Sequence, residues 1–116
     1  LSGIGIKYIN MDEWFFKGHF IDDPTMPSTL ITEAMLQTNV AILYLKEKNK
    51  SNRIFITKSV VNNFDKINSK GTITIDSRIE NEKKGVFQAS SQVFFEDKKV
   101  ANGNFRYINP KFFLTK

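Results

Sequence analysis

The sequence predicts an α+β fold in which an antiparallel β-sheet wraps around one long central helix. Residues 30–48 contain neither glycine nor proline, and their apolar side chains lie nearly all round a helical cylinder. Much of the remaining chain alternates between polar and apolar residues, which is the period of a β-strand. A helix that is apolar on every side must be buried on most sides, and a sheet wrapped around it is the simplest cover.

The helix follows an aromatic loop region. Residues 12–27 contain two prolines and a dense group of aromatic residues, a composition that predicts a structured loop. Pro27 cannot extend a helix backwards, and Ser28 or Thr29 can supply the N-cap oxygen, so we expect the helix to begin directly after them. An exit loop at residues 49–52 ends it.

Five segments have the pattern of β-strands. Ile4, Ile6 and Tyr8 share one face of the first segment, and the last two segments join around residues 96–98, a hairpin signature. The predicted strands span residues 2–10, 53–61, 72–80, 85–95 and 99–107.

Length and composition restrict the class of protein. A chain of 116 residues, 41% hydrophobic and 25% charged, predicts one soluble globular domain over residues 1–116. The absence of cysteine excludes disulfides, thiolate nucleophiles and cysteine metal sites. No segment approaches the ~18 apolar residues of a membrane span and no leader opens the chain, so we expect a cytoplasmic protein without a membrane partner. Because the chain begins at Leu1, we expect sequence upstream of it.

The net charge of +5 does not indicate a nucleic-acid partner. Basic residues alternate with acidic ones, as in residues 46–50 and 80–84, instead of forming a basic stripe. The phenylalanines fall in periodic apolar segments, where they belong to a core. Lysines that only solvate the surface explain the charge, and an acidic protein partner is the alternative.

Two residues are candidates for acid–base chemistry. His19 is the only histidine, so any imidazole base near neutral pH must be this residue, although a histidine among aromatic residues is more often structural. Glu33 is a carboxylate on an otherwise apolar helix, on the face that carries Gln37. We expect it to be buried, which would favour its protonated form and suit a general acid. The alternative is a surface glutamate that interacts with the helix dipole.

Three segments in register resemble the signature of the bacterial β-hydroxyacyl-(acyl carrier protein) dehydratases, a family with the hot-dog fold. Residues 14–20 read Trp-Phe-Phe-Lys-Gly-His-Phe, residues 24–27 read Pro-Thr-Met-Pro, and residues 33–37 read Glu-Ala-Met-Leu-Gln. Glu33 stands fourteen positions after His19, which is the family's separation between acid and histidine. Glutamate as the acid favours the plain dehydratases over the related dehydratase-isomerases.

The resemblance implies removal of water from a 3-hydroxyacyl thioester to give a trans-2-enoyl thioester. His19 would take the C2 proton, and protonated Glu33 would give its proton to the departing C3 hydroxyl. The residues implied in oxyanion and substrate binding are Ser28, Gln37, Gly18 and Phe20. Among them, the backbone N–H of Ser28 would hold the charge that develops on the thioester oxygen, and Gln37 would orient Glu33.

The resemblance also implies partners and an assembly. The acyl chain would arrive on the phosphopantetheine arm of an acidic acyl carrier protein, and the reaction needs no metal or redox cofactor. The family builds each site from two subunits, with the histidine from one and the acid from the other. We therefore expect a homodimer, or a larger homo-oligomer built from dimers.

The chain departs from the family pattern near the motif. Ile21 and Asp22 stand where the family has proline and glycine, and Ser28 stands where it has glycine. The family's amino-terminal strand and helix segment is largely absent. Two other functions stay open: a hot-dog thioesterase in which Glu33 activates water, and a non-catalytic acyl-binding module whose pocket these changes block.

Overall fold

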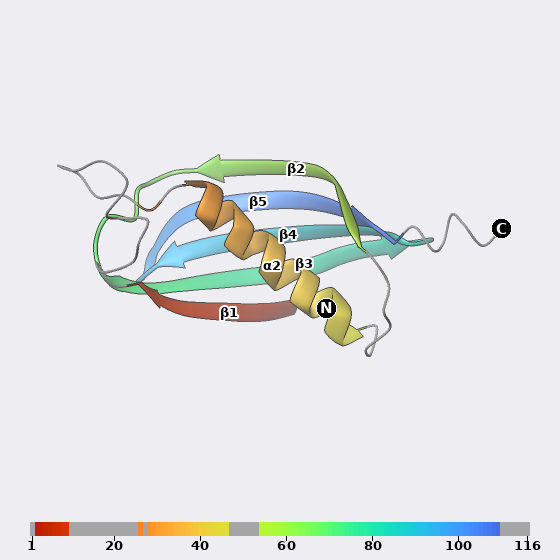
Figure 1. Cartoon of the computed structure of the whole chain (residues 1–116), viewed down its shortest axis with the longest axis horizontal. Coiled ribbons are helices and arrows are strands. Elements are labelled where there is room, and N and C mark those ends of the chain that lie inside the picture. Colours follow the sequence, from red (N-terminus) through yellow and green to blue (C-terminus); the bar gives the residue numbers. More distant parts are fainter. Residues whose placement is uncertain (1, 10–25, 27, 47–53, 110–116) are drawn as a thin grey trace.

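A computed structural model describes residues 2–9, 26, 28–46 and 54–109 of the chain. Within them, five antiparallel strands form one sheet and a single helix lies across one of its faces (Figure 1). In chain order the elements are β1 (Ser2–Ile9), α2 (Ser28–Lys46), β2 (Phe55–Asn63), β3 (Gly71–Lys83), β4 (Val86–Phe95) and β5 (Lys98–Ile108). This arrangement confirms the predicted α+β class, and every element ends within three residues of its predicted boundaries.

The sheet has the strand order β1-β3-β4-β5-β2, so that β1 and β2 are its edges. β3, β4 and β5 follow one another through tight turns, in which Gly85 and Glu96 take positive φ angles of 80° and 54°. β3 is longer than predicted because residues 81–83 continue the ladder with residues 86–88 of β4. Residues 81–83 are polar throughout, so the alternation that predicts a strand is missing there.

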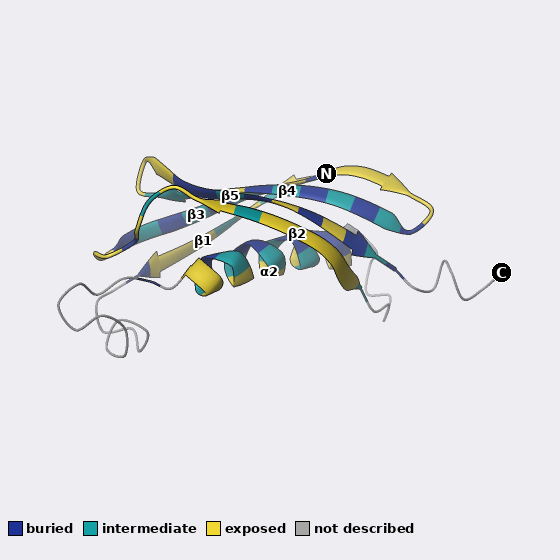
Figure 2. Ribbon diagram, turned by 90° about the horizontal axis from the view of Figure 1, so that it is seen from above, coloured by how far each residue is buried: buried dark blue, intermediate teal, exposed yellow. Residues whose placement is uncertain are grey.

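The helix α2 is buried along one stripe only. The buried residues of this stripe are Ile31, Met35, Asn39, Ile42 and Leu43. The opposite face is open, with Tyr44 43% and Leu45 80% exposed (Figure 2). The prediction that the sheet buries the helix on most sides is therefore wrong for a single chain. A single sheet meets only one side of a cylinder, and no other described element covers the rest.

Gly103 is a point at which the core has no spare room. A Cβ atom built on it would lie 2.6 Å from the ring of Phe105 and 3.2 Å from the sulfur of Met35. Both neighbours are buried, so neither can move into solvent. We expect Gly103→Ala to lower the free energy of unfolding by about 1–3 kcal/mol through overpacking, measured by denaturant unfolding.

Gly5→Ala is the matched control for this prediction. A Cβ atom at Gly5 would meet the hydroxyl of Thr38 at 3.0 Å and otherwise lie in ordinary van der Waals contact. Thr38 is only partly buried, so a smaller loss of stability is expected. Equal losses in the two variants would show that Gly103 is not the tighter position.

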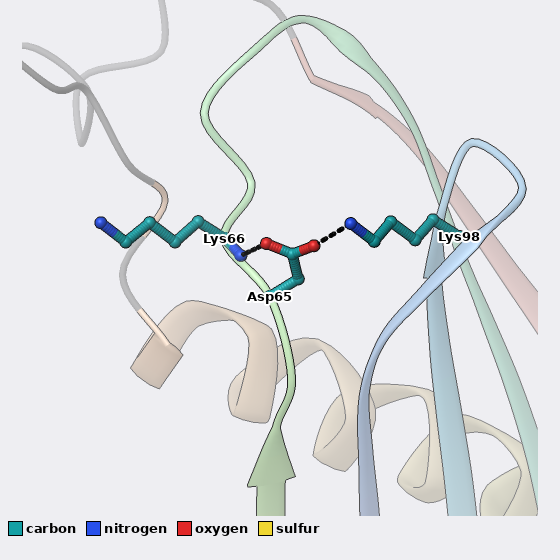
Figure 3. Close-up of polar contacts among 3 residues, drawn as sticks. All are labelled: Asp65, Lys66 and Lys98. Atoms are coloured by element: carbon teal, nitrogen blue, oxygen red, sulfur yellow. Dashed lines mark hydrogen bonds and ion pairs between the residues drawn. The ribbon is translucent and has the colours of Figure 1, made fainter.

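The connection between β2 and β3 is fixed by Asp65. Its carboxylate accepts a 2.8 Å hydrogen bond from the backbone N–H of Lys66 and pairs with Lys98 at the start of β5 (Figure 3). The hydrogen bond from Lys98, followed by that from Lys66, lowers the pKa of the Asp65 carboxyl below its ordinary value. Two residues further on, the carbonyl of buried Ile67 accepts a 2.7 Å bond from the backbone N–H of Met26. The connection therefore anchors the chain just before α2 begins.

Both edge strands expose apolar side chains. Ile4, Ile6 and Tyr8 share one face of β1, as predicted, and this face is exposed, at 66%, 71% and 56% for the three side chains. β2 exposes Phe55 and Val60 in the same way. These edges are surfaces at which another strand or subunit could extend the sheet. In the part of the chain that the structure describes, no helix combines the length and apolarity needed to cross a membrane.

Candidate active site

Glu33 and Gln37 lie one helical turn apart on the open face of α2. The side-chain amide of Gln37 donates a 3.0 Å hydrogen bond to Oε1 of Glu33. This contact holds one carboxylate oxygen at a defined place and leaves Oε2 free for another partner. The pair is thus arranged as the sequence predicted, since residues four apart on a helix face each other.

A shallow apolar groove begins at Glu33. Its volume is about 370 Å³, and it runs between the open face of α2 and the edge strand β2. The residues that line it are Glu33, Leu36, Gln37, Val40, Ala41, Tyr44 and Ile56. Because a carboxyl group stands at a surface that is otherwise mainly apolar, the groove suits a ligand with a polar reacting end and an apolar chain.

The expected burial of Glu33 is wrong for the single chain. Its side chain is exposed, because it projects from the face of α2 that points away from the sheet. An apolar helix predicts burial on most sides, but the sheet of one chain covers only one side of α2. Any cover over Glu33 must come from outside the described residues of one chain.

Ser28 is the first residue of α2 and is exposed. It therefore lies in the first helical turn, whereas the sequence predicted an N-cap at Ser28 or Thr29. Backbone N–H groups of the first turn have no partner within the helix, so that of Ser28 is available to an external acceptor. The positive end of the helix dipole adds to its attraction for negative charge.

Three of the predicted site residues lie outside the described residues. They are His19, Gly18 and Phe20. The same holds for Ile21 and Asp22, at which the chain departs from the family pattern. The pairing of His19 with Glu33 accordingly stays a prediction from the sequence.

Sequence reasoning missed a chain of four buried polar side chains beneath α2. Asn39 donates a 3.1 Å hydrogen bond through Nδ2 to the hydroxyl of Tyr107, and its Oδ1 accepts a 3.1 Å bond from Ser91. Ser91 and Ser77 lie 2.8 Å apart through their hydroxyl oxygens. All four residues are at most 1% exposed. A signal was present in the sequence, because Ser77 lies on the same strand face as three isoleucines.

Burial raises the pKa of the Tyr107 phenol to about 12, and the negative charge of Glu33 adds to the rise, against the opposing effect of Asn39. Because the folded-state pKa lies above the ordinary value of 10.0, the stability linked to this proton is complete below pH 10 and is lost as the pH rises toward 12. We expect up to about 2 kcal/mol of alkaline destabilisation from this group. Tyr107→Phe should remove it.

Chemical unfolding between pH 9 and pH 12 measures this effect. The stability difference between wild type and Tyr107→Phe should shrink across that range. Tyr44 is 43% exposed, so Tyr44→Phe is the control and should leave the alkaline profile unchanged. A constant difference between wild type and Tyr107→Phe would contradict the prediction.

Comparison with known proteins identifies relatives. The model of the FabA-like domain family matches residues 3–104. The 3-hydroxyacyl-(acyl-carrier-protein) dehydratase FabZ of Caldicellulosiruptor bescii is 31% identical over 100 residues, covering 85% of this chain and 71% of that protein. The dehydratase of the same name from Anoxybacillus flavithermus is 41% identical over 54 residues, which are 47% of this chain and 38% of that protein. The chain thus spans less than half the length of the second relative.

Solved structures share the fold at low sequence identity. A hot-dog-like protein from Thermanaerovibrio acidaminovorans superposes with a TM-score of 0.75 at 15% identity, over 93% of this chain and 79% of that one. A probable thioesterase from Bartonella henselae gives a TM-score of 0.72 at 9% identity, over 92% and 88% of the two chains. These likenesses concern the fold alone, and they confirm the hot-dog arrangement. With a family match across nearly all of its length and this fold, the chain belongs to the FabA-like domain family.

Proposed function

We propose that the protein dehydrates 3-hydroxyacyl thioesters carried on acyl carrier protein. The observation that carries the proposal is the Glu33 carboxyl, held by Gln37 at the start of an apolar groove on the central helix. The C. bescii and A. flavithermus relatives bear the name of this activity. An acid beside an apolar groove suits a substrate whose reacting carbons carry an acyl tail.

The proposed reaction is a syn or anti loss of water across C2 and C3, and it needs one base and one acid. His19 takes the C2 proton, and the electron pair of that C–H bond is shared with the thioester oxygen as an enolate before it forms the C2=C3 double bond. The C3–O bond breaks as protonated Glu33 gives its proton to the hydroxyl, which leaves as water. A positioned acid or base of this kind contributes roughly 10²–10⁴-fold to the rate. The chemistry requires neither a metal nor a redox cofactor.

The thioester oxygen gains negative charge as the C2 proton leaves. The backbone N–H of Ser28 is the proposed donor to it, since it lies in the first turn of α2, at the positive end of the dipole. Serine in place of the family's glycine keeps this N–H. The Cβ atom of Ser28 leaves less space for the substrate than glycine would, so we expect the change to alter which substrates are accepted.

We further propose a homodimer that completes the site. The groove beside Glu33 is open in one chain, and Ile56 of the edge strand β2 lines it. Pairing of two β2 edges would place a second subunit over this face of both helices and shield both carboxyls. The histidine would then reach Glu33 from the other subunit. An acidic carrier protein fits the +5 charge of the chain, and we propose a cytoplasmic setting for it.

The test is an assay with 3-hydroxyacyl-(acyl carrier protein) substrates of several chain lengths, following both enoyl absorbance and free thiol. Growth of enoyl absorbance without thiol is the expected result. Release of thiol without enoyl product would identify a thioesterase. Tight acyl binding without either product would identify an acyl-binding module.

A further inference from the structure

We propose that the buried chain Ser77–Ser91–Asn39–Tyr107 is a positioning device that fixes α2, and with it Glu33, against the sheet. The proposal rests on the dehydratase function proposed above, in which Glu33 is the acid. Asn39 is the polar member of the buried stripe of α2. It bonds Ser91 of β4 and Tyr107 of β5, and Ser91 in turn contacts Ser77 of β3. The helix is thereby joined by hydrogen bonds to the middle of the sheet.

The contacts form one continuous chain of hydrogen bonds. Ser91 donates its single hydroxyl proton to Oδ1 of Asn39, and in this arrangement it accepts from Ser77 at the 2.8 Å contact. Asn39 in turn donates through Nδ2 to Tyr107. Both partners are hydroxyl groups, which can donate or accept, so the two contacts of the amide hold the Asn39 side chain between β4 and β5.

Hydrogen bonds add a directional constraint to the apolar packing of the helix. Burial of the stripe residues Ile31, Met35 and Leu43 stabilises α2 on the sheet, but the hydrophobic effect itself has no direction. Hydrogen bonds weaken steeply when their distance or angle changes. A small rotation or slide of α2 would break both contacts of Asn39 and leave buried polar groups without partners, which is costly.

The position of the Glu33 carboxyl depends on how α2 is placed, because Glu33 is on the same helix as Asn39. It lies six residues before Asn39, about 9 Å along the helix axis at 1.5 Å per residue. A general acid displaced by about 1 Å loses much of its effect, on the order of tenfold or more in rate.

A variant in which the whole chain is apolar separates positioning from stability. Asn39→Val, Ser77→Ala, Ser91→Ala and Tyr107→Phe together remove every polar group, so that none is left buried without a partner. We expect a melting temperature close to wild type, a kcat lower by about tenfold and a KM within about twofold. Wild-type kcat at wild-type stability would overturn the proposal, because the chain would then serve only to stabilise the fold.

A matched pair covers the case in which the combined variant does not fold. Ser91→Thr and Ser91→Val add the same volume to the core, and only threonine keeps the hydroxyl. Both variants are assayed below their melting temperatures. Ser91→Thr should then have the kcat of the wild type, and Ser91→Val should have a lower kcat. Equal kcat values would reject the proposal. Asn62 makes a similar 3.1 Å bond to Asn102 in an exposed position, so Asn62→Ala is the control and should keep its kcat.

Nuclear magnetic resonance gives a readout that does not depend on activity. Amide signals of α2 should form one sharp set in wild type and should broaden or double in the fully apolar variant. Sharp single signals in that variant would overturn the positioning role even if the wild type proved to have no dehydratase activity. Absence of enoyl formation by the wild type would instead reject the proposed function alone.

Discussion

Glu33→Gln should lower the turnover of 3-hydroxyacyl thioesters by about 10²–10⁴-fold, and His19→Ala should do the same. Glutamine keeps the shape of Glu33 and its contact with Gln37, but it has no acidic proton to give to the C3 hydroxyl. Alanine at position 19 removes the only imidazole of the chain. Because Glu33 is exposed, its replacement should leave the melting temperature nearly unchanged.

The measurement is enoyl formation under saturating substrate, with circular dichroism to verify the fold. Glu80→Gln is the control for Glu33→Gln, since it makes the same chemical change at an exposed position of β3. It should retain wild-type turnover. Near-normal dehydration by His19→Ala would exclude this residue as the base.

A mixture of the two inactive variants should recover activity if two subunits share each site. When His19→Ala and Glu33→Ala are unfolded and refolded together in equal amounts, random pairing makes half of the dimers mixed. Each mixed dimer contains one intact site and one site with both lesions. Activity should therefore rise to about a quarter of the wild-type value, by counting sites in a two-fold symmetric dimer.

The same experiment distinguishes a site that belongs to one chain. Every site in the mixture would then carry a lesion, and activity would stay near zero. Differently tagged subunits, purified in two steps, show whether mixed dimers have formed. Mixed dimers without recovered activity would reject the shared site, while the separate tests of Glu33 and His19 would stand.

Most of the fold is predictable from sequence because its elements have strong local patterns. The run without glycine or proline predicts α2, and alternation predicts the five strands to within three residues. Burial is less predictable, because it depends on which residues from distant parts of the chain pack against each segment. Ile4, Ile6 and Tyr8 have the pattern of an inward face, yet they point outward on an edge strand. Their environment depends on what lies beside that edge, which local sequence does not encode.

The candidate site is predictable where it depends on helical geometry. The contact between Glu33 and Gln37 follows from their spacing of four residues. The exposure of Glu33 does not follow, because the apolar residues around it meet the sheet on one side only. Asn39 and Tyr107 are 68 positions apart, and a hydrogen bond between them depends on how the helix is placed over β5. No pattern in either segment predicts that placement.

The strand order also has a consequence for the order of folding. β3 and β4 meet through a turn in which Lys83 pairs with Val86, so this ladder closes after little loss of chain entropy. By contrast, Ile9 of β1 pairs with Gly71, 62 positions later, and Asn63 of β2 pairs with Ala101, 38 positions later. We expect the hairpins of β3, β4 and β5 to form first and to act as a template for both edges. The groove at Glu33 includes an edge residue, so it takes shape only as the last strands join the sheet.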